Sequence, residues 1–188
     1  MIPVFVLVFF LDGILPFNYA VAAIIFALAA CTDFIDGYIA RSRGLVTNLG
    51  KFLDPIADKV LVATAMILLL TMQDTLFSLF GQAQTIAYIV TTIFICVILA
   101  RELIISAFRQ IAAAGGVVMA ADKLGKYKTT FQDVAIFVLI FAVNLPLSVA
   151  TVFAYIGGVL FTAATVLTVW SGISYVIKNK QVLQDKKD

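Results

Sequence analysis

Long uncharged apolar stretches constrain this chain more than any other feature of its sequence. Residues 13–32, 75–100 and 134–177 contain no Asp, Glu, Lys or Arg. A helix needs about 20 apolar residues to cross roughly 30 Å of hydrocarbon, so the last stretch, with Pro146 near its middle, is long enough to cross twice. The chain is 63% hydrophobic and 13% charged, which leaves too few polar residues to coat a soluble domain of this size.

A chain that enters a bilayer must satisfy its backbone hydrogen bonds internally, as a helix or a closed barrel. The sequence lacks the short alternating pattern of a barrel. We therefore predict an all-α integral membrane protein with six transmembrane helices, over residues 1–12, 18–43, 50–72, 82–112, 127–145 and 151–177. One transmembrane catalytic domain would occupy residues 1–177, and residues 178–188 would form a short basic tail.

The basic residues surround alternate links between the expected spans or lie in the C-terminal tail. They are Arg41, Arg43, Lys51, Lys59, Arg101, Arg109, Lys123, Lys126, Lys128, Lys178, Lys180, Lys186 and Lys187. The other links contain Asp12 and Asp74 but no Lys or Arg. The positive-inside rule makes the basic face cytoplasmic, with both termini on that side. No basic residue precedes the first apolar stretch, so we expect no cleaved signal peptide.

The residue types exclude several kinds of chemistry. The chain has no histidine, which removes Ser-His and Cys-His nucleophile pairs and the commonest zinc ligand. Cys31 and Cys96 lie within apolar segments, and we expect them to be buried small hydrophobic residues without a redox role. Any reaction must therefore use carboxylates, Lys, Arg or hydroxyl groups.

Two aspartates lie near the end of the second expected span. Asp33 and Asp36 are three positions apart, which separates them by roughly 60° around a helix. Gly37 and Ala40 project within about 40° of Asp33 by the same geometry. This face therefore presents two carboxylates beside two very small side chains, which predicts an acidic recess.

Two further aspartates lie near the start of the third expected span. Asp54 and Asp58 are four positions apart and share one helix face. A tight reversal over residues 42–49 would make the two acidic helices antiparallel neighbours. Four converging carboxylates would repel one another without cations, and oxygen ligands alone favour Mg²⁺ or Mn²⁺. Two such ions would suit phosphoryl transfer.

Each aspartate also has a purely structural interpretation. Asp54 precedes Pro55 and is suited to cap a helix N-terminus. Asp33 could pair with Arg41, and Asp58 with Lys59 or another neighbour. The four together, near one short link, favour function, because carboxylates in membrane segments are costly and usually functional.

These positions match a family signature, D-x2-D-G-x2-A-R-x8-G-x3-D-x3-D. The matching residues are Asp33, Asp36, Gly37, Ala40, Arg41, Gly50, Asp54 and Asp58. In this pattern the chain resembles the CDP-alcohol phosphotransferase family. Residues 100–102 and 124–129, with Arg109, resemble the bacterial members that make phosphatidylglycerophosphate.

The resemblance implies a six-helix fold, usually a homodimer, in the bacterial cell membrane with its cavity open to the cytoplasm. It implies transfer of the phosphatidyl group from CDP-diacylglycerol to glycerol 3-phosphate, which releases CMP. Nothing in the resemblance implies a nucleic-acid partner. Family members usually carry an amphipathic segment with an N-x-x-T-type motif before the first span, and the sequence lacks it.

The resemblance also implies roles for individual residues. The expected metal ligands are Asp33, Asp36, Asp54 and Asp58, and Asp58 would also be the catalytic base. The expected contacts to CDP-diacylglycerol come from Asp33, Gly37, Ala40 and Arg41. The expected contacts to the phosphate of glycerol 3-phosphate come from Arg101, Arg109 and Lys126. The residues alone do not distinguish Lys126 from Lys128 in this role.

Several alternatives stay open at this stage. Arg101 and Arg109 are separated by roughly 80° around a helix and can face one cavity, but they could instead snorkel or pair with Glu102 and Asp122. The acceptor could be inositol phosphate or another alcohol. The chain could also be a divalent-cation transporter, or a membrane scaffold without activity.

Overall fold

The computed structural model describes the backbone of residues 1–42, 48–114 and 123–179. It also describes their side chains, except those of residues 33–42, 48–58, 113–114, 123, 124 and 126. These ranges are helical throughout apart from short links, and they contain no strand. The elements are α1 (Ile2–Phe9), α2 (Asn18–Ser42), α3 (Asn48–Leu70), the 3₁₀-helix η1 (Phe77–Ala83), α4 (Gln84–Ala114), α5 (Lys123–Ala142) and α6 (Leu147–Lys178). The prediction of an all-α bundle is confirmed, and each expected span overlaps one of the observed α-helices.

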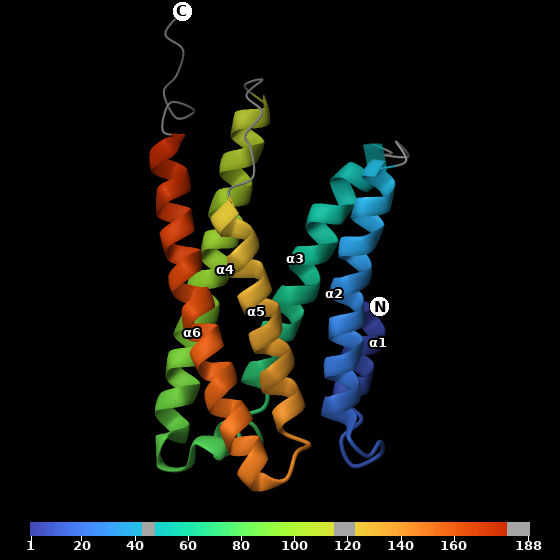
Figure 1. Cartoon of the computed structure of the whole chain (residues 1–188), viewed down its shortest axis with the longest axis vertical. Helices are drawn as coiled ribbons and strands as arrows, with labels where there is room; N and C mark the ends of the chain where they lie inside the picture. The colour runs from blue at the N-terminus through green and yellow to red at the C-terminus, as the bar shows by residue number, and fades with distance from the viewer. Residues whose placement is uncertain (43–47, 115–122, 180–188) are drawn as a thin grey trace, which may run out of the picture.

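The six α-helices run up and down in chain order (Figure 1). The C-terminal ends of α2, α4 and α6 and the N-terminal ends of α3 and α5 lie at one end of the bundle, the upper end in Figure 1. We call this the basic end, because the described residues Arg101, Arg109, Lys128 and Lys178 lie in the helix halves nearest to it. The links over residues 10–17, 71–83 and 143–146 lie at the opposite end and contain no Lys or Arg. The predicted segregation of charge is therefore present in the fold.

Helix length and hydropathy fit a membrane protein. Among the described residues, the segments Phe77–Ala112 and Leu147–Lys178 are each long and apolar enough to cross a bilayer. Shorter apolar stretches, Asn18–Thr32 and Lys59–Leu70, lie in α2 and α3. Helix α1 has eight residues and is about 12 Å long, which is less than half of the hydrocarbon thickness. As described, α1 is therefore shorter than the predicted first span.

Prolines and glycines fix where helices begin and how the chain turns. Pro3 lies in the first turn of α1, where its missing N–H costs no hydrogen bond, and Pro146 immediately precedes α6. Gly81 has φ = 56° and ψ = −124° at a bend within η1, three residues before α4 begins. A side chain would strain this backbone conformation, so glycine is the residue suited to the bend.

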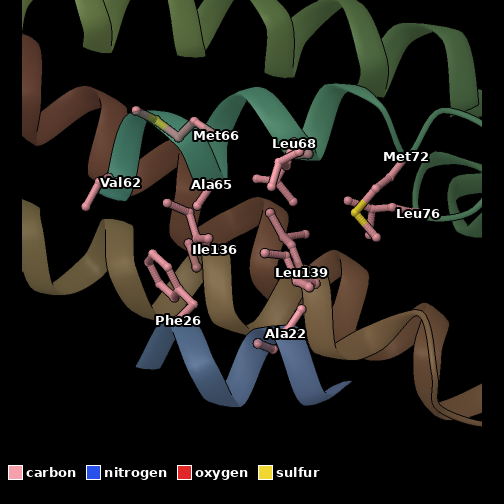
Figure 2. Close-up of a cluster of buried hydrophobic side chains, with 14 of the residues drawn as sticks. Ala22, Phe26, Val62, Ala65, Met66, Leu68, Met72, Leu76, Ile136 and Leu139 are labelled. Carbon is pink, nitrogen blue, oxygen red and sulfur yellow. The ribbon is translucent and has the colours of Figure 1, made fainter. Parts of the chain in front are cut away.

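The hydrophobic core lies where α2, α3 and α5 meet (Figure 2). Phe26 of α2 and Ala65 of α3 point toward Ile136 of α5, and all three are almost fully buried. Leu139 of α5 extends the cluster toward the link that contains Met72. This core joins the two helices that carry the signature aspartates to the rest of the bundle.

Helix α6 approaches α5 closely over its length, and glycine makes this possible. A Cβ atom at Gly157 would lie 2.7 Å from Cγ and Cδ2 of Leu139, which is closer than real Cβ contacts. Four threonine hydroxyls on α6 donate to the carbonyl four residues earlier, so they are satisfied within the helix. These are Thr151, Thr162, Thr165 and Thr168.

The prediction that the two cysteines are buried is wrong. Cys31 and Cys96 are free thiols and both are exposed on the bundle surface. The buried face of α2 follows Ala22, Phe26 and Ala29, and Cys31 lies off that face. The apolar neighbourhood in the sequence reflects a surface suited to lipid, where a small hydrophobic residue is equally acceptable.

Candidate functional site

The four signature aspartates lie on the two helices that meet at the basic end. Asp33 and Asp36 belong to the last three turns of α2, and Asp54 and Asp58 belong to the first three turns of α3. Helices α2 and α3 contact each other and run in opposite directions (Figure 1). The predicted antiparallel arrangement of the two helices is thus confirmed, and residues 43–47 of the link between them lie outside the described residues.

The backbone places these aspartates at matching depths. At a rise of 1.5 Å per residue, Asp36 lies about 9 Å from the end of α2, and Asp54 lies about 9 Å from the start of α3. Asp33 and Asp58 lie about 14 Å and 15 Å from the same ends. Because the helices are antiparallel neighbours, the four positions form two levels with one aspartate from each helix.

A polar contact connects α3 to α4 one residue beyond the last aspartate. The ammonium group of Lys59 donates to the hydroxyl of Ser106. The Ser106 hydroxyl in turn donates to the backbone carbonyl of Glu102, one turn earlier in α4. The residue after Asp58 is therefore joined to the segment of α4 that carries the predicted phosphate-binding arginines.

Glu102 bridges two cations from different helices. Its Oε1 atom accepts a hydrogen bond from Nη1 of Arg101 at 3.0 Å, and the ammonium group of Lys128 in α5 donates to the same oxygen. The Lys128 side chain is 7% exposed, and those of Arg101 and Glu102 are 15% and 24% exposed. Removal of a charge from such a site is costly, because each ion depends on its partner for the solvation that water would otherwise give.

Both predicted arginines turn toward α6. Nη2 of Arg101 donates to the hydroxyl of Ser171 at 2.9 Å. Nε of Arg109 donates to the hydroxyl of Tyr175 at 3.1 Å, and the Arg109 guanidinium carbon lies 5.1 Å from the centroid of the Tyr175 ring. Both arginines therefore contact the same neighbouring helix, and the alternative that Arg101 pairs with Glu102 is confirmed.

The other predicted site residues are known only by their place in the backbone. Those on α2 and α3 are Asp33, Asp36, Gly37, Ala40, Arg41, Asp54 and Asp58, and Lys126 lies in the first turn of α5. Their side chains, and all of Asp122, lie outside the described residues. Among the side chains that the structure does describe, no group of three or more acidic, histidine or cysteine residues could hold a metal ion.

The structure adds Ser171 and Tyr175, which the sequence did not single out, and describes the side chain of Lys128, which the sequence left as an alternative to Lys126. Lys128 is 6% exposed and lies on the same face of α5 as the buried residues Gln132, Ala135 and Ile136. These buried positions follow Lys128 at i+4, i+7 and i+8, so Lys128 lies in phase with the core. This spacing is the signal that could have distinguished Lys128 from Lys126. Ser171 and Tyr175 had no such signal, because a serine and a tyrosine near the end of an apolar helix have many ordinary roles.

Comparison with known proteins relates the whole chain to one group of enzymes. Residues 1–170 match the family model for CDP-alcohol phosphatidyltransferase. The chain is 38% identical to the CDP-diacylglycerol–glycerol-3-phosphate 3-phosphatidyltransferase of Escherichia coli strain K12, over 99% of this chain and 92% of that protein. It is 39% identical to the protein of the same name from Salmonella typhimurium strain LT2, with the same coverage. It is 38% identical to the Bacillus subtilis strain 168 protein of that name, over 92% of this chain and 80% of that protein.

Proposed function

The chain belongs to the CDP-alcohol phosphatidyltransferase family, and from this premise we propose that it transfers the phosphatidyl group of CDP-diacylglycerol to glycerol 3-phosphate. The products are phosphatidylglycerophosphate and CMP. The similarity to relatives named for this reaction, along almost the entire chain, carries the proposal. The cluster of cationic side chains beside α3 supports it, because an acceptor that carries a phosphate needs such partners.

Divalent metal fits the donor set on α2 and α3. Carboxylate oxygens without histidine or cysteine suit Mg²⁺ or Mn²⁺, and the backbone puts one aspartate from each helix at each of two levels. We assign two ions to Asp33, Asp36, Asp54 and Asp58. When bound, the ions would neutralise the pyrophosphate of CDP-diacylglycerol and the charge that develops on the departing CMP.

The chain's own residues then orient the two substrates and move one proton. Gly37, Ala40 and Arg41 would line the nucleotide end of the CDP-diacylglycerol pocket, beside Asp33. Asp58 would accept the proton from a hydroxyl of glycerol 3-phosphate as that oxygen attacks the lipid-side phosphorus. The new P–O bond forms as the bond between this phosphorus and the CMP oxygen breaks, so CMP leaves with the electron pair.

The acceptor's phosphate would be held on the other side of the site. Arg101 and Arg109 are our candidates from α4, since both carry guanidinium groups that suit a phosphate. Lys126 is assigned from the family resemblance, and we add Lys128, whose ammonium group is buried beside Glu102. The phosphate would compete with the Glu102 carboxylate for Arg101 and Lys128.

Helix lengths support a multi-pass arrangement in the bacterial membrane. Helices α2 to α6 have 20 to 32 residues each, which corresponds to about 30–48 Å, and each can cross the hydrocarbon layer. Helix α1 packs beside α2, but at eight residues it would reach only part of the way across the bilayer. Six complete crossings would require a longer first helix than the one described. We place the basic end, the C-terminal tail and the active site on the cytoplasmic side, and propose a homodimer.

An acceptor panel tests the proposal. Purified protein in mixed micelles with CDP-diacylglycerol and Mg²⁺ or Mn²⁺ should release CMP with glycerol 3-phosphate, and should stop when a chelator is added. Inositol phosphate and other alcohols should give little CMP. Turnover with another acceptor but none with glycerol 3-phosphate would overturn the substrate assignment. Uptake of Mn²⁺ into liposomes that lack CDP-diacylglycerol would instead favour a transporter.

A further inference from the structure

We propose that the last two turns of α6 position the two arginines of the acceptor site. The positioning residues are Ser171, Gly172 and Tyr175, and the inference rests on the proposed role of Arg101 and Arg109 in binding glycerol 3-phosphate. These residues lie directly after residue 170, where the family match ends, so the match gives them no role.

The two arginines are held by α6 through well-defined contacts. Arg101 donates to Ser171 at 2.9 Å, and Arg109 donates to Tyr175 at 3.1 Å. Ser171 is 1% exposed and Tyr175 is 4% exposed, so neither partner is free to move with its arginine. Tyr175 is fixed further by the ring of Phe108, with ring centroids 6.2 Å apart in an edge arrangement.

The partners of the two arginines lie closer together along α6 than the arginines lie along α4. Arg101 and Arg109 are about 12 Å apart along α4, whereas Ser171 and Tyr175 are about 6 Å apart along α6. The two helices contact each other and run in the same direction (Figure 1). Helix α6 therefore holds arginines from two different turns of α4 through partners that are only one turn apart, and the two guanidinium groups are within electrostatic reach of each other. Two like charges held close together are suited to a dianionic phosphate.

Gly172 provides the space through which the Arg101 side chain passes. A Cβ atom at Gly172 would lie 3.0 Å from both Cγ and Nε of Arg101. Nε of Arg101 is buried and has no hydrogen-bond partner among the described residues. An unsatisfied buried donor costs free energy. Packing alone does not require Arg101 to adopt a position with this cost. This cost is consistent with an orientation needed for binding.

Steady-state kinetics of CMP release provides the test. In Ser171→Ala, Gly172→Ala and Tyr175→Phe we expect the KM for glycerol 3-phosphate to rise roughly 5- to 30-fold. The serine and tyrosine variants lose a hydrogen bond to an arginine, and the glycine variant displaces the side chain of Arg101. The KM for CDP-diacylglycerol should stay within about twofold of the wild-type value, since the nucleotide end of the site is unchanged. Tyr175→Leu, which also loses the ring beneath Arg109, should have a larger effect than Tyr175→Phe.

Two matched controls lie on the same helix. Thr168→Val removes a buried hydroxyl that bonds only within α6, and Gly158→Ala adds a Cβ atom 3.8 Å from Phe80, an ordinary contact. Both should keep the wild-type KM for glycerol 3-phosphate. Because KM does not depend on the amount of active enzyme, partial unfolding of a variant does not obscure the comparison.

The possible outcomes separate this inference from the proposed function. If the wild-type enzyme uses glycerol 3-phosphate but the three variants keep its KM, the inference alone is overturned. The same holds if the two KM values rise together, or if only the thermal midpoint falls, since both results indicate helix packing. A wild-type protein that releases no CMP with glycerol 3-phosphate overturns the proposed function and the inference with it.

Discussion

Replacement of Glu102 by glutamine tests the ion cluster at the centre of the basic end. Glu102→Gln keeps the shape and the acceptor oxygen of the side chain but removes the negative charge between Arg101 and Lys128. The two cations would then face each other in a largely buried site. Loss of one partner from a buried ion pair costs about 3–5 kcal/mol.

The expected loss of stability can be expressed as a shift in unfolding temperature. For a chain of this length, 1 kcal/mol corresponds to about 2–4 °C, so the lower estimate of about 3 kcal/mol lowers the thermal midpoint by about 6–12 °C. An anion should restore part of this loss, because it can occupy the place of the carboxylate charge. At a phosphate concentration tenfold above its Kd, the gain is about 1.4 kcal/mol, or about 3–6 °C.

Thermal unfolding in detergent, with and without phosphate, measures both effects. Sodium chloride at equal ionic strength controls for screening, and Asp74→Asn, in an exposed link at the opposite end, controls for loss of a carboxylate. Phosphate should stabilise Glu102→Gln more than the wild type, in which it must displace Glu102. A variant that unfolds at the wild-type temperature and gains no more from phosphate than the wild type does would refute the reasoning.

Three further predictions concern packing, helix ends and chemistry. Gly157→Ala should lower the free energy of unfolding by about 1–3 kcal/mol, because its Cβ atom would overlap Leu139. Gly158→Ala is the control and should have a thermal midpoint close to that of the wild type. Equal midpoints for the two variants would contradict the close approach of α5 and α6. Asn144→Ala should lower the free energy of unfolding by about 1 kcal/mol, as measured by chemical denaturation. The reason is that Oδ1 of Asn144 accepts a hydrogen bond from a backbone amide in the first turn of α2 at 2.7 Å. An unchanged denaturation midpoint would show that this bond contributes nothing. Asp58→Asn should abolish CMP release while Mn²⁺ binding persists, and appreciable turnover in that variant would rule out Asp58 as the base.

The helices could be predicted from the sequence because their signal is local. A long uncharged stretch has few alternatives to a helix in lipid, and observed helices such as α6 (Leu147–Lys178) begin and end within a few residues of the expected spans. The reversal between α2 and α3 was also predictable, since a short polar link leaves two apolar helices antiparallel. The exposure of Cys31 and Cys96 could not be predicted, because hydropathy does not distinguish a helix face that packs against protein from one that faces lipid.

The site was predictable only where it follows a sequence pattern. Signature spacing predicts a metal site at the aspartates of α2 and α3, and helical periodicity predicts that Arg101 and Arg109 can face one cavity. The partners of these arginines were not predictable, because Ser171 and Tyr175 are about 70 residues away in the chain and only tertiary packing brings them close. Glu102 was recognised as a possible partner of Arg101, but its bridge to Lys128 depends on how α4 and α5 are paired.

The most direct test of the central claim follows the lipid-side phosphorus of CDP-diacylglycerol. With ³²P in the phosphate attached to diacylglycerol, the purified protein, Mg²⁺ and glycerol 3-phosphate should move the label into phosphatidylglycerophosphate and release one unlabelled CMP for each lipid formed. Without glycerol 3-phosphate, the label should stay in CDP-diacylglycerol. Label that appears in phosphatidic acid whether or not glycerol 3-phosphate is present, or that never leaves CDP-diacylglycerol, would contradict the account.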